Sequence, residues 1–279
     1  MREKLLLIGA GGNLGRSFCR VLDARGERYR AVDYPEVDVR DPAHVEAAIA
    51  PGTELVINCS AYTDVDGAES AIDAAMALNA EAPGRMAARC AELGARYVDF
   101  GTDYVFNGKG EAPYPVDGEH NPCNAYGRSK AAGEKAIAAA GGKHLIVRTS
   151  WLYAPWGKNF VLTIAKLARE NDTIQVVDDQ RGRPTSAIYL AQRALQLLDA
   201  GATGIYHGTD GGECTWFDFA SAIVEGLRID CKVEACGSHR YPRPAVRPAY
   251  SVLDLSQPEA LIGPSRSWRE NLADVLRQL

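Results

Sequence analysis

The fold is decided by the stretch Lys4-Leu-Leu-Leu-Ile-Gly-Ala-Gly-Gly-Asn-Leu-Gly15, in which an apolar run leads into glycines at 9, 12 and 15. The residues that follow, Asn13–Arg25, repeat their apolar side chains at helical spacing. A strand, a glycine turn and a helix start let the backbone approach a pyrophosphate and offer it helix N–H donors. The stretch therefore predicts a dinucleotide-binding loop at Gly9, Gly12, Asn13, Leu14 and Gly15, rather than a glycine turn without a ligand.

Strands and helices then alternate through the first half of the chain. The further strands predicted are Tyr29–Asp33, Leu55–Ser60, Tyr97–Thr102 and His144–Arg148, and the helices are Ala68–Leu93 and Tyr126–Ala140. Apolar strands that alternate with helices indicate a parallel sheet buried on both faces. We therefore expect an α/β fold, a Rossmann-like doubly wound parallel sheet, with a smaller C-terminal α/β region that binds substrate.

The second half is less regular. Its predicted helices are Asn159–Arg169, Ile188–Ala200, Phe217–Leu227 and Trp268–Gln278, its strand is Ile205–His207, and Ser238–Ser251 should be a loop because it is rich in proline and arginine. We expect residues 1–150 to form the dinucleotide-binding domain. Residues 151–279 should form mainly the substrate-binding region, packed directly on that domain, with the chain free to cross between the two.

Composition excludes several classes of protein. The 279 residues carry a net charge of −5, which argues against a nucleic-acid partner. No apolar stretch approaches the length of a membrane span, and the N-terminus lacks the apolar region of a secretory signal, so we expect a cytoplasmic protein. The seven cysteines form no CxxC pair and the histidines no HExxH motif, so neither disulfides nor a bound metal is predicted.

An acidic residue at the end of the second strand bears on the cofactor. Asp33 follows Gly15 at a distance suited to a hydrogen bond with the adenosine ribose, and its charge repels a 2′-phosphate. The cofactor is therefore NADH or NADPH, with NADH slightly favoured; Arg16 and Arg40 keep dual use open. A turn or capping role is the alternative for Asp33. Just beyond it, Asp38-Val39 are candidates to flank the adenine.

Three residues suggest proton transfer to a carbonyl. Tyr126 and Lys130 are four positions apart on a predicted helix and share one face. A lysine ammonium beside a phenol stabilises the phenolate and lowers its pKa. Thr102 ends a predicted strand, where ligands bind in open α/β sheets. The order of glycine loop, strand-end threonine and YxxxK favours a catalytic triad over an ordinary helix face and a capping hydroxyl.

These motifs resemble the extended short-chain dehydrogenases, and within them the dTDP-4-dehydrorhamnose reductase family. The matching segments span most of the chain: Gly9–Gly15, Asn58–Glu69, Gly101–Phe106, Asn124–Glu134, Arg148–Tyr153, Asp179–Thr185, Gly204–His207 and Arg243–Pro248. The resemblance implies reduction of dTDP-4-dehydro-L-rhamnose to dTDP-L-rhamnose, with Thr102, Tyr126 and Lys130 as the catalytic residues. It also implies that Tyr126 and Lys130 contact the cofactor.

The resemblance also assigns residues around the two ligands. It implies that Ala61, Tyr62 and Thr63 line the cofactor site. It places Val65, Thr102, Asp103, Tyr126 and Trp151 near the sugar, with a simple core role as the alternative for Trp151. Arginine binds phosphate through two parallel hydrogen bonds, so Arg243 or Arg247 is expected to hold the diphosphate of the nucleotide sugar; a solvated loop is the alternative.

The chain departs from the family in places that bear on function. Ser17 stands where some relatives carry an acid that contributes to a magnesium-bridged dimer, so that metal-linked dimer is not predicted, and a homodimer of another kind stays compatible with the sequence. Cys59-Ser60 replace two alanines, and the C-terminal third diverges. Two alternatives therefore remain, a reductase of another NDP-4-keto sugar and a noncatalytic nucleotide-binding regulatory subunit.

Overall fold

The computed structural model describes residues 3–279. The strands are β1 (Leu5–Ile8), β2 (Tyr29–Val32), β3 (Leu55–Asn58), β4 (Arg96–Thr102), β5 (His144–Thr149), β6 (Leu152–Tyr153), β7 (Thr173–Val177), β8 (Arg181–Gly182), β9 (Thr185–Ser186), β10 (Gly204–His207), β11 (Cys214–Thr215) and β12 (Lys232–Cys236). The α-helices are α1 (Asn13–Ala24), α2 (Pro42–Ala48), α3 (Gly67–Ser70), α4 (Ile72–Met76), α5 (Ala82–Leu93), α6 (Ala125–Ala139), α7 (Phe160–Glu170), α8 (Ala187–Asp199), α9 (Trp216–Gly226), α10 (Ser256–Ile262) and α11 (Trp268–Leu276). One π-helical turn, η1 (Ala77–Glu81), and two 3₁₀ turns, η2 (Asp103–Val105) and η3 (Ser238–Arg240), complete the set.

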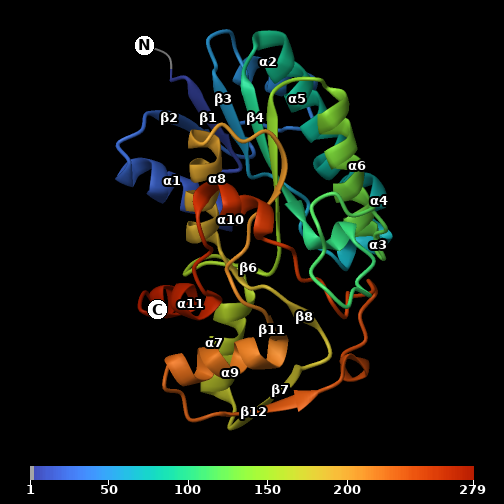
Figure 1. Ribbon diagram of the computed structural model, residues 1–279, viewed down its shortest axis with the longest axis vertical. Helices are drawn as coiled ribbons and strands as arrows, with labels where there is room; N and C mark the ends of the chain where they lie inside the picture. Colours follow the sequence, from blue (N-terminus) through green and yellow to red (C-terminus); the bar gives the residue numbers. More distant parts are fainter. Residues whose placement is uncertain (1–2) are drawn as a thin grey trace.

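Six parallel strands form the central sheet in the order β10-β5-β4-β3-β1-β2. Successive residues of a strand face opposite sides of the sheet, so each strand contributes to two cores. Leu7 and Ile57 pack with α1 and α8 on one side, and Leu6 and Val56 pack with α5 on the other. Figure 1 shows these helices on the two faces, which confirms the expected doubly wound α/β fold.

The strand order reverses between β1 and β3 because the chain builds the sheet outward from β1 in both directions. At such a point the loops after two adjacent strands diverge and leave a crevice at their carboxyl ends, which is where open α/β sheets bind ligands. The loops after β1, β3 and β4 therefore meet around one space. This topology places the glycine loop and Thr102 at the same edge of the sheet.

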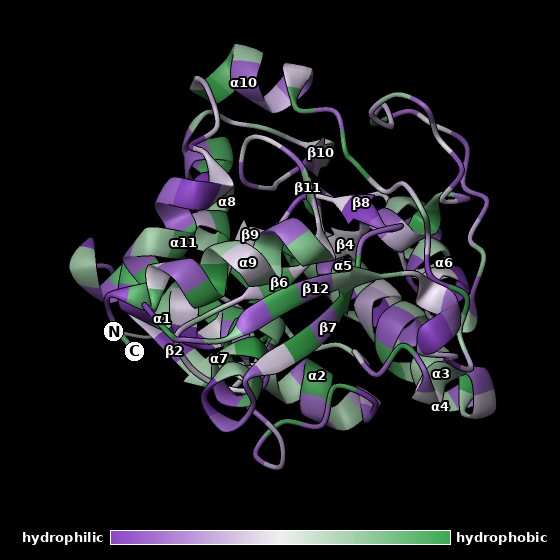
Figure 2. Cartoon of the chain, turned by 90° about the horizontal axis from the view of Figure 1, so that it is seen from below, coloured by the Kyte–Doolittle hydropathy of each residue, from purple (hydrophilic) through white to green (hydrophobic). Residues whose placement is uncertain are grey.

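A second body lies beyond the carboxyl ends of the strands (Figure 1). Its core is formed by aromatic and aliphatic side chains of α7, α9 and α11. β7 and β12 pair in parallel on its surface, side by side in Figure 2. The chain crosses between the two bodies, because β10 completes the central sheet and α8 packs against α1.

The predicted helix Ala68–Leu93 is wrong as a single element, since the structure divides it into α3, α4, η1 and α5. The break between α3 and α4 lies at Ala71, whose φ of −128° and ψ of 47° are not helical. The change before α5 is explained by Pro83, which lacks an N–H and whose ring collides with the carbonyl four residues earlier in a regular helix. The wider π turn Ala77–Glu81 precedes it and accommodates the ring. The other predicted helices and strands shift by one or two residues. The predicted loop Ser238–Ser251 contains only the short turn η3. No helix within residues 3–279 is both long and apolar enough to cross a membrane.

Candidate active site

A cavity of about 900 Å³ opens at the carboxyl ends of the central strands. The loops of the central sheet form one side of it, and residues of the second body, among them Phe160 and Trp216, form the other. Of the predicted site residues, those that line it are Gly9, Gly12, Asn13, Leu14, Asp33, Asp38, Val39, Ala61, Thr63, Val65, Thr102, Asp103, Tyr126, Lys130 and Trp151. Gly15, Tyr62, Arg243 and Arg247 do not line it. The volume lies near the upper end of the range for ligand pockets.

The glycines of the first loop have different structural roles. Gly9 has a φ of +77°, and a Cβ there would lie 2.6 Å from the backbone nitrogen of Ser60. A Cβ on Gly15 would lie 2.0 Å from the carbonyl oxygen of Gly9, so this glycine lets α1 pack on the loop without lining the cavity. A Cβ on Gly12 would meet nothing closer than 3.6 Å. Gly12 therefore keeps the approach to the start of α1 open.

The start of α1 has the features of an anion site. Gly12 is its N-cap and supplies no side-chain cap, and the first turn carries no acidic residue. The first N–H groups of a helix have no partner within the helix, so those of Asn13 and Leu14 are available at the cavity wall. The positive end of the helix dipole is at the same place. A pyrophosphate fits these groups.

Asp33 is held by the glycine loop itself. Its Oδ2 accepts a hydrogen bond of 2.6 Å from the N–H of Gly11, and its Oδ1 accepts one of 2.8 Å from the N–H of Tyr34. Nearby, Arg40 donates to both carboxylate oxygens of Asp38, at 2.8 and 2.7 Å. This pairing lowers the pKa of Asp38 to about 2 and compensates the charge of Arg40.

The loop after β3 is positioned by a residue that the sequence analysis missed. Asn79, in the π turn η1, accepts from the N–H of Tyr62 and donates to its carbonyl, at 2.9 and 3.0 Å. It also donates to the hydroxyl of Ser129 on α6, at 2.9 Å. Tyr62 thus supports the loop through its backbone, while Ala61 and Thr63 face the cavity. A Cβ on Gly133 would lie 2.0 Å from the carbonyl oxygen of Asn79, so α6 approaches this turn only because residue 133 is glycine.

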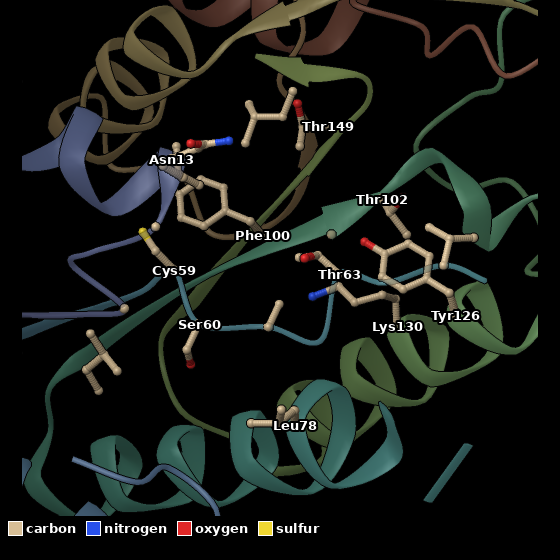
Figure 3. Close-up of a pocket in the computed structure, with 18 of the residues that line it drawn as sticks. Asn13, Cys59, Ser60, Thr63, Leu78, Phe100, Thr102, Tyr126, Lys130 and Thr149 are labelled. Atoms are coloured by element: carbon tan, nitrogen blue, oxygen red, sulfur yellow. The ribbon is translucent and has the colours of Figure 1, made fainter. Parts of the chain in front are cut away.

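Thr102, Tyr126 and Lys130 lie together at the cavity, as the spacing predicted (Figure 3). Tyr126 and Lys130 come from successive turns of α6, and Thr102 ends β4. Asn124 caps α6 by accepting from the N–H of Gly127 at 2.7 Å, which fixes where the helix begins. A Cβ on Gly127 would lie 2.2 Å from the carbonyl oxygen of Tyr104. The first turn of α6 therefore packs directly on the segment after Thr102.

The ionisation of Tyr126 differs from the sequence prediction. Burial raises the pKa of its phenol to about 12, the hydroxyl of Thr102 offsets part of the rise, and the charges of Asp103 and Asp99 add to it. The prediction of a lowered pKa is therefore wrong for this chain. Lys130 instead forms an ion pair with the buried carboxylate of Asp99, with 3.6 Å between Nζ and Oδ1. Tyr126 is thus protonated at neutral pH, the form that donates a proton.

Asp103 and Trp151 form the wall of the cavity beside Thr102. The Oδ1 of Asp103 accepts from the hydroxyl of Thr102 at 3.1 Å, while its buried Oδ2 has no hydrogen-bond partner within residues 3–279. Burial raises the pKa of Asp103 to about 7. Trp151 has a φ of +47°, an unusual backbone conformation for a bulky residue, and stacks on Trp216 with ring centroids 3.6 Å apart. Both tryptophans line the cavity, so Trp151 is more than a core aromatic.

The two arginines expected at the diphosphate lie outside the cavity wall. Arg247 donates to both carboxylate oxygens of Asp66, at 3.0 and 2.9 Å, and to the carbonyl of Ala245. This pair lowers the pKa of Asp66 and joins the proline-rich loop to the segment after β3. Arg243 is exposed, and its charge also acts on Asp66. Sequence spacing gave no sign of the Asp66–Arg247 pair, since 181 positions separate the two residues.

Comparisons with known proteins agree with this site. The family model of the RmlD substrate binding domain matches residues 3–279. A dTDP-4-dehydrorhamnose reductase of Mycolicibacterium smegmatis is 42% identical over 99% of this chain and 86% of its own length. A dTDP-4-keto-6-deoxy-D-glucose reductase of Streptomyces niveus is 37% identical over 99% of this chain and 97% of its own length.

A solved structure has the same fold throughout. The dTDP-4-dehydrorhamnose reductase of Bacillus anthracis, determined in complex with NADP, superposes with a TM-score of 0.94 at 32% identity and covers 100% of both chains. The family model and these similarities all extend over nearly the whole chain. With its uncapped helix start and its Thr102, Tyr126 and Lys130 at one cavity, the chain belongs to the dTDP-4-dehydrorhamnose reductase family.

Proposed function

We propose that this chain reduces the C4 keto group of dTDP-4-dehydro-L-rhamnose to give dTDP-L-rhamnose, with NADH or NADPH as the reductant. The observation that carries the proposal is the arrangement of Thr102, Tyr126 and Lys130 around the cavity into which the start of α1 opens. An anion-binding helix start and a buried phenol are what a nicotinamide-dependent keto reductase needs in one place. Family membership supports the same reaction.

Tyr126, Thr102 and Lys130 are proposed to have different roles in the reaction. A bound reduced nicotinamide supplies the hydride that adds to the carbonyl carbon. Tyr126 donates its phenolic proton to the carbonyl oxygen as that oxygen gains negative charge, and its raised pKa keeps the proton in place until then. Thr102 is proposed to donate a hydrogen bond to the same oxygen, for which its hydroxyl turns away from Oδ1 of Asp103, the acceptor that it reaches at 3.1 Å in this structure. The ammonium of Lys130 then stabilises the phenolate that Tyr126 becomes.

The cofactor is proposed to lie along the glycine loop. Gly9, Gly12, Asn13 and Leu14 would hold its pyrophosphate, and Asp33 its adenosine ribose. Each oxygen of Asp33 accepts one backbone N–H, and a carboxylate oxygen accepts two hydrogen bonds, so both can still accept from a ribose hydroxyl.

A preference for NADH over NADPH follows from the charges at this end of the cavity. The carboxylate of Asp33 repels a 2′-phosphate, and the nearby Arg40 is already paired through both carboxylate oxygens of Asp38. We therefore propose a modest preference for NADH. Asp38 and Val39 line the cavity beyond Asp33 and are proposed to flank the adenine.

The sugar nucleotide is proposed to bind between Asp103 and the second body, whose core is formed by α7, α9 and α11. Asp103 lines the cavity beside Thr102, and its carboxyl is proposed to accept a hydrogen bond from a sugar hydroxyl. Val65 and Trp151 also line the cavity and are proposed to lie near the sugar. Arg247 is paired with Asp66, so it is proposed to approach the diphosphate with the carboxylate of Asp66 still beside it. Arg243 is exposed to solvent and is the alternative arginine for the diphosphate.

A second candidate is reduction of another dTDP-4-keto sugar. The Streptomyces niveus relative, named for a different keto sugar, is almost as similar to this chain as the rhamnose enzymes. A noncatalytic regulatory subunit is less well supported, because binding alone requires no buried phenol beside a strand-end threonine and a lysine.

The test is oxidation of NADH and of NADPH by the purified protein in the presence of dTDP-4-dehydro-L-rhamnose made in situ, with product identified by mass spectrometry and chromatography. Formation of dTDP-L-rhamnose is the expected result, with Tyr126→Phe as the inactive control. Turnover only with another keto sugar would favour the second candidate. Cofactor binding without turnover on any keto sugar would exclude the catalytic proposal.

A further inference from the structure

Asp99 is a buried carboxylate that the proposed mechanism does not use. It lies on β4, three residues before Thr102, and is 3% exposed. Its Oδ1 lies 3.6 Å from the Nζ of Lys130, whose side chain is 6% exposed. Removing one member of such a buried pair leaves an uncompensated charge, which is strongly unfavourable. Asp99 does not line the cavity, so it acts on the site only through its neighbours.

The orientation of this carboxylate is fixed by two donors. The hydroxyl of Tyr97 donates to its Oδ2 at 2.6 Å, and the side-chain amide of Asn58 donates to the same oxygen at 2.8 Å. Asn58 in turn accepts from the N–H and the hydroxyl of Ser60, at 3.0 and 2.6 Å. Both donors occupy Oδ2, so Oδ1 remains directed to Lys130.

We infer that Asp99 is a positioning residue for catalysis, one that holds Lys130 in place and keeps its ammonium charged beside Tyr126. The inference rests on the proposed reductase function and assigns a role within that same site. Without a counter-charge, a desolvated ammonium gives up its proton more readily. A neutral Lys130 would no longer stabilise the phenolate of Tyr126.

Several other titratable groups surround this pair, and Asp99 is the carboxylate that faces Lys130 directly. Burial raises the pKa of both Tyr97 and Cys59 well above their ordinary values, so both stay neutral through the working range of pH. Tyr126 is likewise protonated, with a pKa of about 12 to which the charge of Asp99 contributes. Asp103, whose pKa is about 7, is the group near Tyr126 that changes charge around neutrality.

The test is the pH dependence of turnover in Asp99→Asn, which keeps the shape of the side chain and removes its charge. Loss of an opposite charge at this distance shifts an ionisation by about 1 to 3 pH units. The phenol of Tyr126, whose pKa the charge of Asp99 raises, then loses its proton at lower pH, and Lys130 loses its fixed partner, so the fall in activity on the alkaline side moves to lower pH. The loss of kcat relative to wild type is expected to be at least about 10-fold greater at about pH 9 than at about pH 6.

The matched control is Tyr97→Phe, which removes one hydrogen bond from Asp99 and keeps the charge. Its effect on kcat is expected to be the same at both pH values. If the loss of kcat in Asp99→Asn is the same at both pH values, as in the control, the inference is overturned and Asp99 has only a structural role. Circular dichroism checks that each variant is folded. If Asp99→Asn does not fold, Asp99→Ser is used in its place, since it also removes the charge.

A second measurement does not depend on turnover. A neutral amine reacts with acylating reagents and an ammonium does not, so acylation of Lys130, followed by mass spectrometry, reports its charge. Lys130 is expected to react faster in Asp99→Asn than in Tyr97→Phe or the wild type at about pH 8. Equal rates would overturn the inference. A wild type that shows no turnover would contradict the proposed function, while the acylation rates still test Asp99.

Discussion

The ionisation of Asp103 leads to a quantitative prediction about stability. Burial raises its pKa from 3.8 to about 7. An acid with a higher pKa in the folded chain binds more protons there than in the unfolded chain, so the free energy of unfolding falls as pH rises between the two values. Asp103→Asn removes this penalty. The variant is therefore expected to be more stable than the wild type at neutral pH, although it loses the acceptor proposed for the sugar.

The magnitude follows from the two pKa values. Each unit of difference corresponds to about 1.4 kcal/mol, and most of the interval from 3.8 to about 7 lies above pH 5. Between about pH 5 and about pH 8 the free energy of unfolding of Asp103→Asn should rise by about 2–3 kcal/mol relative to the wild type. Urea unfolding at several pH values, followed by circular dichroism, measures this difference.

Asp66→Asn is the matched control because the pKa of Asp66 is shifted the other way, downward, by hydrogen bonds from Arg247 and Ala245. Such an acid stabilises the fold above its unfolded pKa, and the contribution is lost as pH falls through the folded pKa. The variant should be less stable than the wild type by about 1 kcal/mol, with no change between about pH 5 and about pH 8. A stability difference for Asp103→Asn that is equally flat over this range would refute the reasoning.

Four further substitutions test the site. Tyr126→Phe should lower kcat about 10²–10⁴-fold and leave the cofactor Kd unchanged in a fluorescence titration; full activity would remove Tyr126 as the acid. Asp33→Ala should weaken NADH more than NADPH, measured as the ratio of the two kcat/KM values, and an unchanged ratio would count against the ribose contact. Gly133→Ala places a Cβ 2.0 Å from the carbonyl oxygen of Asn79, so α6 must move and kcat should fall about 10²-fold; normal kinetics would show that α6 tolerates the shift. Arg247→Ala should raise the substrate KM, and an unchanged KM would restrict Arg247 to its structural pair.

The parts of the site that the sequence predicted depend on local spacing. Glycines between an apolar strand and a helix indicate this turn from the sequence, because the turn excludes side chains at Gly9 and Gly15. Tyr126 and Lys130 lie on one helix face because four positions make about one turn. The direction of the pKa shift of Tyr126 was not predictable in this way, since it depends on burial and on Asp99.

The sequence by itself indicated the alternating strands and helices of the central sheet, the glycine loop and the spacing of Tyr126 and Lys130, because each is encoded within a few consecutive residues. It missed the short strands of the second body, such as β7 and β12, and the helices α2 and α10. Only the tertiary structure decided which distant groups meet. It paired Arg247 with Asp66, attached Asn79 to the loop after β3 and placed Asp99 against Lys130. The physical reason is that these contacts join segments far apart in the chain, and only the folded arrangement of the sheet, helices and loops brings such segments together.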